Sequence, residues 1–408
     1  MVTDTEKDNK MKFQHYSKRR PKRFEAETSP SGTFTAVQVA QLYGFPLGSG
    51  AEQTIGLIEL GGGWSSGDLV SAGITNTVID VLIDGATNDY TGDPNSADGE
   101  VALDIQIAAA IAPAALIKVF FAPNTNQGFL DAINAAVQDP QVNIISISWG
   151  GPENTWGTSA LQQFDAAFAK AGKLIFVASG DSGSSDGEKG KNVDFPASSP
   201  HVIACGATSL VANAAMTSIA SEVVWNSDGG SSGGGISSFF ALPAFQAKAK
   251  VPGGKFRGVP DVAANGDPET GFQVIVAGVQ EIYGGTSCDA PLYAGLFARI
   301  APGISSAFLN GILYEYGLPA GSELDFNEIT SGSNGSYSAC PGWNPCCGLG
   351  SPRGTAIEGS VLGSTPAPVP PTPIPPTPVP PPPVSPSSTV LTPGTYTLKP
   401  GAYNLTVQ

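Results

Sequence analysis

Continuous apolar runs alternate with longer helical stretches through the first half of the chain. The apolar runs are rich in β-branched and aromatic residues and predict buried strands at 54–60, 117–121, 143–148 and 174–178. The stretches between them predict helices at 100–111, 128–138 and 159–171. Apolar strands separated by helices are typical of a parallel sheet that is buried on both faces. We therefore expect an α/β fold with a parallel β-sheet flanked by helices.

The composition changes on both sides of this α/β region, which extends over residues 32–363. Residues 1–31 are polar and basic, and we expect a disordered tail there. Its basic run 18–23 is either a solvated charge cluster, a processing site or a nucleic-acid contact. Residues 364–388 are rich in proline and predict an extended polyproline II linker or an SH3-type ligand. Residues 389–408 repeat a Pro-Gly-x-Tyr theme and predict a short β-type tail.

Charge excludes two classes of partner. The formal net charge is -15, and the 20 Lys and Arg residues include eight in the N-terminal 31 residues. The rest of the chain is therefore more acidic still, and we expect no binding to nucleic acid or to anionic membranes. Only 13% of the residues are charged, which suits an acidic medium because few ion pairs are lost when carboxylates become protonated.

The sequence contains neither a long apolar span nor an apolar segment typical of a signal peptide. Five cysteines are present, and three of them cluster at Cys340, Cys346 and Cys347. Their spacing does not match a zinc site. A disulfide from Cys340 to Cys346 or Cys347 and free thiols are both open at this point.

A glycine turn at 284–287 delivers Ser287 to the start of an apolar helix, where it is a candidate nucleophile. The base that usually activates such a serine is histidine, and the chain has only His15 and His201. His15 lies in the basic tail, and His201 lacks the sequence surroundings of a catalytic histidine. The base is therefore expected to be a carboxylate, which points to hydrolysis at acid pH.

Two carboxylates four residues apart, Glu100 and Asp104, share one face of the predicted helix at 100–111. Such a pair can share a proton, so that one acts as the base and the other orients it. Asp181 follows the predicted strand 174–178, at the edge of the sheet where active sites of open α/β folds lie. In its protonated form Asp181 could donate a hydrogen bond to an oxyanion. Solvated carboxylates and an ordinary turn are the alternatives for these positions.

These motifs together resemble the sedolisin family of serine-carboxyl peptidases, and most closely its kumamolisin branch. The matching segments appear in the family's order over about residues 32–356; they are 99–104, 146–150, 179–183, 285–291, 342–343 and 348–352. The resemblance implies a subtilisin-like fold and an acid-acting endopeptidase that forms an acyl-enzyme. Ser287 would be the nucleophile, Glu100 the base, Asp104 the residue that orients it and Asp181 the oxyanion-hole acid.

The resemblance also implies supporting residues. Glu59 and Trp149 would extend the hydrogen-bond network from Glu100, and Ser148, Trp149 and Gly150 would pair with the substrate backbone. Asp194 would favour a basic side chain beside the scissile bond.

A calcium site is implied as well, formed by residues near the C-terminal end of the domain, namely Glu328, Ile329, Cys340, Gly342 and Asn344. The family pattern has Asp where this chain has Glu328 and Asn344, so the expected Ca²⁺ site is weakened by the loss of one carboxylate charge.

The family resemblance further implies a monomer that acts on proteins or peptides in an extracellular setting. Two other interpretations remain open, namely a peptide-binding homologue without catalysis and a fragment that needs a separate propeptide, since about 31 residues precede the predicted domain. A classical subtilisin is excluded because the chain lacks a matching catalytic histidine.

Overall fold

The computed structural model describes residues 12–20, 32–227, 229–301, 303–318 and 325–364. By its contacts the chain divides into two units, residues 1–365 and 366–408, and every described residue belongs to the first. The predictions for the linker from residue 365 and for the tail 389–408 therefore fall outside the described residues. In the part that is described, no helix is both long and apolar enough to cross a membrane.

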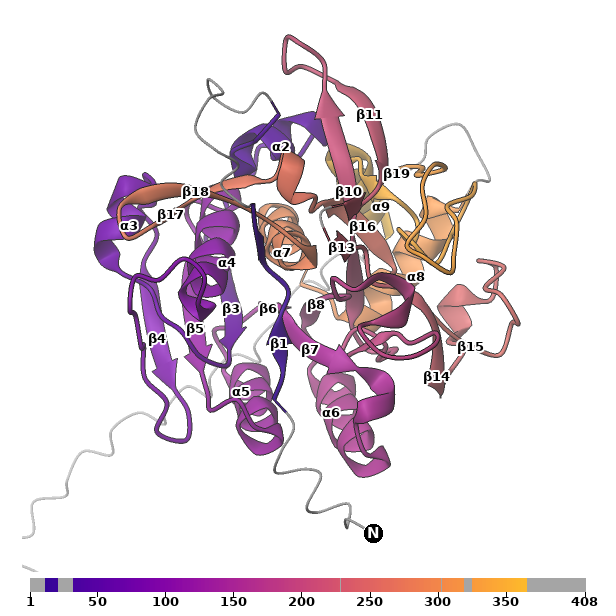
Figure 1. Ribbon diagram of the computed structural model, residues 1–408, viewed down its shortest axis with the longest axis horizontal. Coiled ribbons are helices and arrows are strands. Elements are labelled where there is room, and N and C mark those ends of the chain that lie inside the picture. Colours follow the sequence, from indigo (N-terminus) through magenta and orange to yellow (C-terminus); the bar gives the residue numbers. More distant parts are fainter. Residues whose placement is uncertain (1–11, 21–31, 228, 302, 319–324, 365–408) are drawn as a thin grey trace, which may run out of the picture. The chain divides into compact units, whose positions relative to one another are not determined.

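An eight-stranded sheet forms the centre of the domain, in the order β11-β10-β8-β6-β3-β5-β4, with β16 beside β10 (Figure 1). Only β11 pairs antiparallel, and the remaining strands run parallel. The bounds of these strands are β3 Thr54–Glu59, β4 Val78–Leu82, β5 Leu116–Phe121, β6 Ile144–Ile147, β8 Leu174–Ala178, β10 Ile203–Ala212, β11 Ile219–Val224 and β16 Val262–Asn265. The parallel sheet and its four predicted strands are confirmed.

Helices cover both faces of the sheet. They are α2 Ala36–Leu42, α3 Ser66–Ser71, α4 Ala97–Ile111, α5 Asn126–Gln138, α6 Thr158–Lys170, α7 Asp289–Ile300, α8 Ser306–Gly317 and α9 Gly354–Ser364. One buried apolar cluster contains residues of α4 and α7, and a second contains residues of α5 and α6. Neighbouring β3 residues alternate between them, since Leu57 belongs to the first cluster and Ile58 to the second. The sheet is thus buried on both sides, as its apolar strands predict.

Smaller pairings surround this sheet. Their strands are β1 Gln14–His15, β2 Lys18–Arg19, β7 Trp149–Pro152, β9 Asp194–Phe195, β12 Asn226–Ser227, β13 Gly230–Ser231, β14 Gly235–Ala241, β15 Phe256–Val259, β17 Phe272–Val276, β18 Val279–Gly284, β19 Phe326–Asn327 and β20 Ser351–Pro352. Two three-stranded sheets, β1-β7-β9 and β17-β18-β2, include strands from the N-terminal segment.

The predicted disordered tail of residues 1–31 therefore needs correction within 12–20. These residues form β1 and β2 because open strand edges elsewhere in the domain supply their hydrogen-bond partners.

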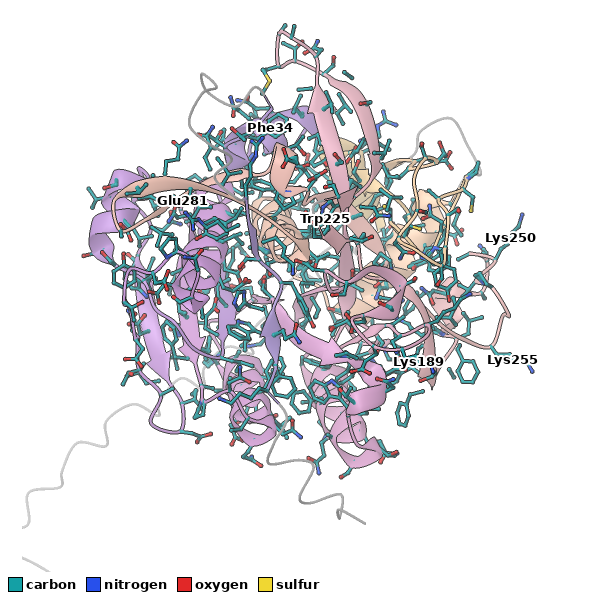
Figure 2. The ribbon with its side chains drawn as sticks, in the orientation of Figure 1. Phe34, Lys189, Trp225, Lys250, Lys255 and Glu281 are labelled. Atoms are coloured by element: carbon teal, nitrogen blue, oxygen red, sulfur yellow. The ribbon has the colours of Figure 1, made fainter. Side chains whose placement is uncertain are left out.

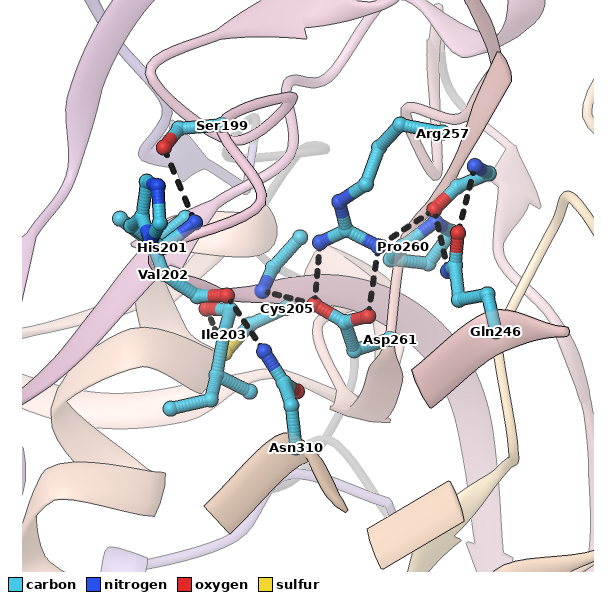
Figure 3. A network of polar contacts seen from close by, with 12 residues as sticks. Ser199, His201, Val202, Ile203, Cys205, Gln246, Arg257, Pro260, Asp261 and Asn310 are labelled. Carbon is cyan, nitrogen blue, oxygen red and sulfur yellow. Dashed lines mark hydrogen bonds and ion pairs between the residues drawn. The ribbon is translucent and has the colours of Figure 1, made fainter. Parts of the chain in front are cut away.

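A buried ion pair holds β15 and β16 to the neighbouring elements (Figure 3). Both Arg257 and Asp261 are 0% exposed, and Arg257 Nη1 and Nη2 donate to the two Asp261 carboxylate oxygens at 2.7 and 2.5 Å. Asp261 also accepts hydrogen bonds from the Ala204 amide of β10 at 2.8 Å and from the Tyr314 hydroxyl of α8 at 2.8 Å. A buried carboxylate with this many donors is fully compensated, so removing one partner would leave a costly unpaired charge.

Candidate active site

The ends of three strands bring site residues together at one edge of the sheet. Glu59 is the last residue of β3, Ser148 follows β6, and Asp181 follows β8 by three residues. Because parallel strands end at the same edge, these side chains share one region, where polar residues are 0–2% exposed. The sequence prediction that Asp181 lies at this edge agrees with the topology.

Ser287 reaches the same region from the start of α7. It lies in a 3₁₀ turn, Thr286–Cys288, directly before the helix, and its side chain is fully buried. Gly285 precedes it with φ of 96°, a conformation that favours glycine. A Cβ at Gly285 would also overlap the carbonyl oxygen of Tyr16. The glycine turn therefore lets another segment of backbone approach Ser287 closely.

Three buried carboxyl groups form the base side of the site. Glu100 and Asp104 lie on α4, which begins after the N-cap Ser96, and both are 0% exposed. Asp104 Oδ1 accepts a hydrogen bond from Ser148 Oγ at 3.0 Å. Burial, together with the charges of Glu59 and Glu100, raises the pKa of Asp104 well above its usual range. The pair predicted from the sequence is therefore fully buried, and Asp104 is the member whose pKa is raised.

Glu59 and Trp149 form the supporting network beside these carboxyls. Trp149 Nε1 donates to Glu59 Oε2 at 2.9 Å, and the indole is 3% exposed. Burial and the charge of Glu100 raise the pKa of Glu59 well above its usual range. The charge of Glu100 thus acts on both Glu59 and Asp104, as a proton-sharing cluster requires.

Asp181, in the turn after β8, contacts the residue that precedes Ser287. Its Oδ1 accepts two hydrogen bonds from Thr286, from the amide at 2.8 Å and from the hydroxyl at 3.0 Å. Its buried Oδ2 has no hydrogen-bond partner. Burial raises the pKa of Asp181 to about 7 despite the opposing hydrogen bonds from Thr286. The unpartnered Oδ2 is therefore the oxygen on which a proton could be carried and donated below that pH.

Residues 12–20 cross this site as an extended segment (Figure 1). β1 pairs antiparallel with β7, with Gln14 opposite Gly150 and His15 opposite Trp149. The Tyr16 amide donates to Ser148 O at 3.2 Å, and the Tyr16 carbonyl accepts from the Ser287 amide at 3.2 Å. The strand predicted to pair with a substrate backbone, residues 148–150, thus pairs with a segment of the same chain.

His15 contacts the predicted base. Its Nδ1 lies 3.2 Å from Glu100 Oε2. Burial lowers the pKa of His15, but contact with Glu100 and the charges of Glu100 and Asp181 outweigh this, so that the pKa is raised. Ser287 Oγ, meanwhile, donates to Ser148 O at 3.5 Å rather than to Glu100. The sequence reasoning set His15 aside as a tail residue and missed this contact, which depends on a long-range pairing without a local signal.

Asp194 lies in a pocket that holds the Tyr16 side chain. The Tyr16 hydroxyl donates to Asp194 Oδ2, and the ring is 5% exposed. Burial and the charge of Asp186 raise the pKa of Asp194 well above its usual range, and burial raises the pKa of Asp186 to about 7. The predicted pocket acid therefore has a second carboxyl beside it. Sequence reasoning missed Asp186, since it belongs to none of the recognised motifs.

The residues expected to bind Ca²⁺ do come together, but their donors do not fit the ion. Asn344 Nδ2 donates to the carbonyls of Ile329 and Cys340 at 3.1 and 3.2 Å. Asn344 Oδ1 accepts from the amides of Cys346 and Cys347, at 3.1 Å each. Rotating the Asn344 amide group would turn Nδ2 toward these two N–H groups, so that donors would face donors.

Glu328 Oε1 accepts from the Gly342 amide at 3.0 Å. The Asn344 amide nitrogen thus occupies the place where the two carbonyls would contact a cation.

All five cysteines are free thiols, which settles the alternative left open for Cys340.

Comparisons with known proteins identify the family of this chain. The subtilase family (Peptidase_S8) matches residues 91–306. Kumamolisin of Bacillus sp. (strain MN-32) is 47% identical over 372 residues, which cover 84% of this chain and 66% of kumamolisin. The chain belongs to the sedolisin family of subtilases, on its kumamolisin branch. Sedolisin of Pseudomonas sp. (strain 101) is 31% identical over 335 residues, covering 74% of this chain and 56% of that protein.

A solved structure gives the same result for this sedolisin-family chain. Pseudomonas sedolisin, a serine-carboxyl proteinase complexed with two molecules of pseudo-iodotyrostatin, superposes with a TM-score of 0.71 at 25% identity. The match covers 82% of this chain and 99% of that one. The relatives also include tripeptidyl-peptidase sed5 of Aspergillus fumigatus, 29% identical, with 78% of this chain and 64% of that protein covered. The chain thus spans less than two thirds of the curated relatives named here.

Proposed function

We propose that the domain is a serine-type endopeptidase that cleaves proteins or peptides at acid pH through an acyl-enzyme. The observation that carries this proposal is the position of Tyr16. Its carbonyl oxygen accepts the Ser287 amide hydrogen, as a scissile carbonyl would in an oxyanion hole. Its own amide pairs with Ser148, and Gln14 pairs with Gly150, as in peptide recognition by strand addition.

The proposed reaction assigns one role to each catalytic residue. Ser287 Oγ attacks the carbonyl carbon of the substrate, and Glu100 accepts the proton that the hydroxyl loses. The Ser287 amide and the protonated Asp181 Oδ2 stabilise the oxyanion. As the tetrahedral intermediate collapses, Glu100 transfers its proton to the departing amine. Water then hydrolyses the acyl-enzyme by the same proton route. Asp104, held by Ser148, orients Glu100 and in its protonated form can donate a hydrogen bond to the ionised Glu100.

The pKa of Asp181 supports activity at acid pH. A carboxyl with a pKa of about 7 is mostly protonated at pH 5, where it donates, and mostly ionised at pH 8, where it repels an oxyanion. His15 sets a second condition. Its ring lies beside Glu100, so Glu100 must leave this contact before it can accept the proton of Ser287.

Residue 13 supports an endopeptidase over a tripeptidyl-peptidase. Counting back from the carbonyl at Ser287, Tyr16, His15 and Gln14 fill the three positions that a released tripeptide would occupy. Phe13 lies one residue further out and is 4% exposed. Its amide donates to Asn124 Oδ1 at 2.8 Å, and its carbonyl accepts from Asn124 Nδ2 at 3.0 Å. A site with a fourth position of this kind accepts chains that continue beyond three residues.

Two further expectations belong to the same proposal. An extracellular location and a monomeric state follow from the family resemblance and remain predictions. A peptide-binding homologue without catalysis is the second candidate function, and the contact of His15 with Glu100 is the observation that favours it.

Casein digestion over pH 3–8, with wild type beside Ser287→Ala, distinguishes the two candidate functions. The endopeptidase proposal predicts digestion below pH 7 by wild type alone. Equal digestion by a pure Ser287→Ala protein would refute the assignment of the nucleophile. Peptide binding without digestion by wild type at any pH would favour the second candidate.

A further inference from the structure

Two glutamates lie beside the part of the N-terminal segment that follows the Tyr16 carbonyl. The Arg19 Nε and Nη2 atoms lie 3.0 and 2.9 Å from Glu281 Oε2. Arg20 Nη2 lies 2.9 Å from Glu269 Oε2. Glu281, labelled in Figure 2, lies on β18 and is only 5% exposed. These contacts place carboxylates opposite the third and fourth residues after the bond that Ser287 would cleave.

Backbone pairing fixes which residue meets which glutamate. β2 pairs antiparallel with β18, with Lys18 opposite Gly284 and Arg19 opposite Tyr283. The Arg20 amide also donates to Ile282 O at 2.8 Å. These bonds use only the backbone and are open to any peptide, and the carbonyl bound to the Ser287 amide sets the register of that peptide along β18. The third residue after the cleaved bond therefore meets Glu281 whatever its side chain is.

The contacts at this position match the shape of a guanidinium group. Arg19 Nη1 donates to Asn95 Oδ1 at 2.7 Å, while Nε and Nη2 face Glu281. The Asn95 side chain is oriented in advance, since its Nδ2 donates to Asp93 Oδ1 at 3.1 Å and leaves Oδ1 for the arginine. A planar fork of donors satisfies both acceptors, whereas a lysine ammonium is a single point charge at the end of a flexible stem.

We propose that Glu281, Asn95 and Glu269 form an acidic subsite that selects arginine at the third and fourth residues after the cleaved bond of a substrate. The inference rests on the proposed function and adds a substrate class to it. It also gives a role to Arg19 and Arg20 of the basic run, whose charges would otherwise be a solvated cluster. Glu281 makes the larger contribution, because it is almost fully buried and receives two donors from one guanidinium.

The test uses nine-residue peptides based on residues 12–20 that differ only at the position of Arg19, which is Arg, Lys or Ala. Cleavage is measured as kcat/KM at pH 5.5 and low salt, where a carboxylate in water is ionised. We expect the Arg peptide to exceed the Ala peptide by roughly 10- to 100-fold, with Lys between them, as charge-assisted hydrogen bonds predict. The chain's own segment competes equally with every peptide, so its effect cancels in the ratio.

Two variants assign the preference to the subsite. Glu281→Gln should reduce the ratio of Arg to Ala to about 3-fold or less, since one neutral hydrogen bond replaces the ion pair. The matched control is Glu315→Gln on α8, which removes a 60% exposed partner of Lys248 elsewhere on the surface and should leave the ratio unchanged. A ratio near one in wild type, or an undiminished ratio in Glu281→Gln, would overturn the proposal.

Binding of the same peptides separates this inference from the proposed function. Fluorescence anisotropy with the Ser287→Ala protein measures affinity without any cleavage. If wild type cleaves none of the peptides but Ser287→Ala binds the Arg peptide at least 10-fold more tightly than the Ala peptide, the subsite stands and the peptidase proposal fails. Equal affinities for the two peptides would refute the subsite itself.

Discussion

Replacing Asp181 by asparagine tests how this side chain serves the reaction. The amide side chain in Asp181→Asn would retain an Oδ1 acceptor for the two bonds from Thr286, and it would place an NH₂ donor where Asp181 has its unpartnered Oδ2. With a pKa of about 7, Asp181 is about 99% protonated at pH 5 and about 10% protonated at pH 8. The fraction of wild-type protein that carries the donor thus falls about tenfold from pH 5 to pH 8, whereas Asp181→Asn keeps its donor at both pH values. The ratio of variant to wild-type kcat/KM should therefore rise about tenfold between pH 5 and pH 8.

The assay is cleavage of one fluorogenic peptide by both proteins at half-unit steps from pH 4 to 8. Titration of the substrate affects both proteins alike and cancels in the ratio. Asp181→Ala serves as the control, because it removes the donor and should lose on the order of 10²–10³ in kcat at pH 5. A ratio for Asp181→Asn that stays flat from pH 5 to 8 would refute the view that a protonated Asp181 donates to the oxyanion.

Further predictions concern the base, the buried ion pair and the altered cation site. Glu100→Ala and Asp104→Ala should each lower kcat by about 10²–10⁴. The double variant should match the poorer single variant, because the two carboxyls act as one unit that either single substitution already disables. Additive losses in kcat would contradict a shared proton network. Asp261→Ala should destabilise the domain by about 3–5 kcal/mol in urea unfolding, since Arg257 is left buried and unpaired; a loss under ~1 kcal/mol would contradict this. Chelator should leave the melting temperature of wild type unchanged, whereas Asn344→Asp should gain calcium-dependent melting because a carboxylate then faces two carbonyls; melting of wild type that falls with chelator would show that the amide does not replace the ion.

The central sheet could be predicted because its residues carry their own pattern. The run at 54–60 is mostly apolar, and β3 extends over Thr54–Glu59 with every residue buried. The helix predicted at 100–111 is mostly apolar, and α4 contains all of these residues. Burial on both faces of a strand or around a whole helix leaves a signal in the local sequence, which explains why the four catalytic candidates could be placed on the correct elements.

The N-terminal segment could not be predicted in this way. Residues 12–20 are largely polar and basic, and β1 and β2 are each two residues long. Their structure comes from the edges of β7 and β18, which lie more than a hundred residues away in the sequence. Asp186 was missed for a related reason, since it belongs to no recognised motif and its place beside Asp194 of β9 depends on the tertiary fold. The calcium prediction relied on which residues were present, whereas the donors that Asn344 offers are decided by the direction of its amide group.

Intact mass spectrometry of the acidified protein tests the central claim most directly. Tyr16 presents its carbonyl to the Ser287 amide, so the bond between Tyr16 and Ser17 is the one that the proposed reaction would break. Wild type brought from pH 8 to pH 4 should be cut after Tyr16 and yield a chain that begins at Ser17, whereas Ser287→Ala under the same conditions should remain intact. A wild-type chain that stays whole between residues 12 and 20, while a Tyr16-containing peptide of the same sequence is also left uncut, would contradict the account.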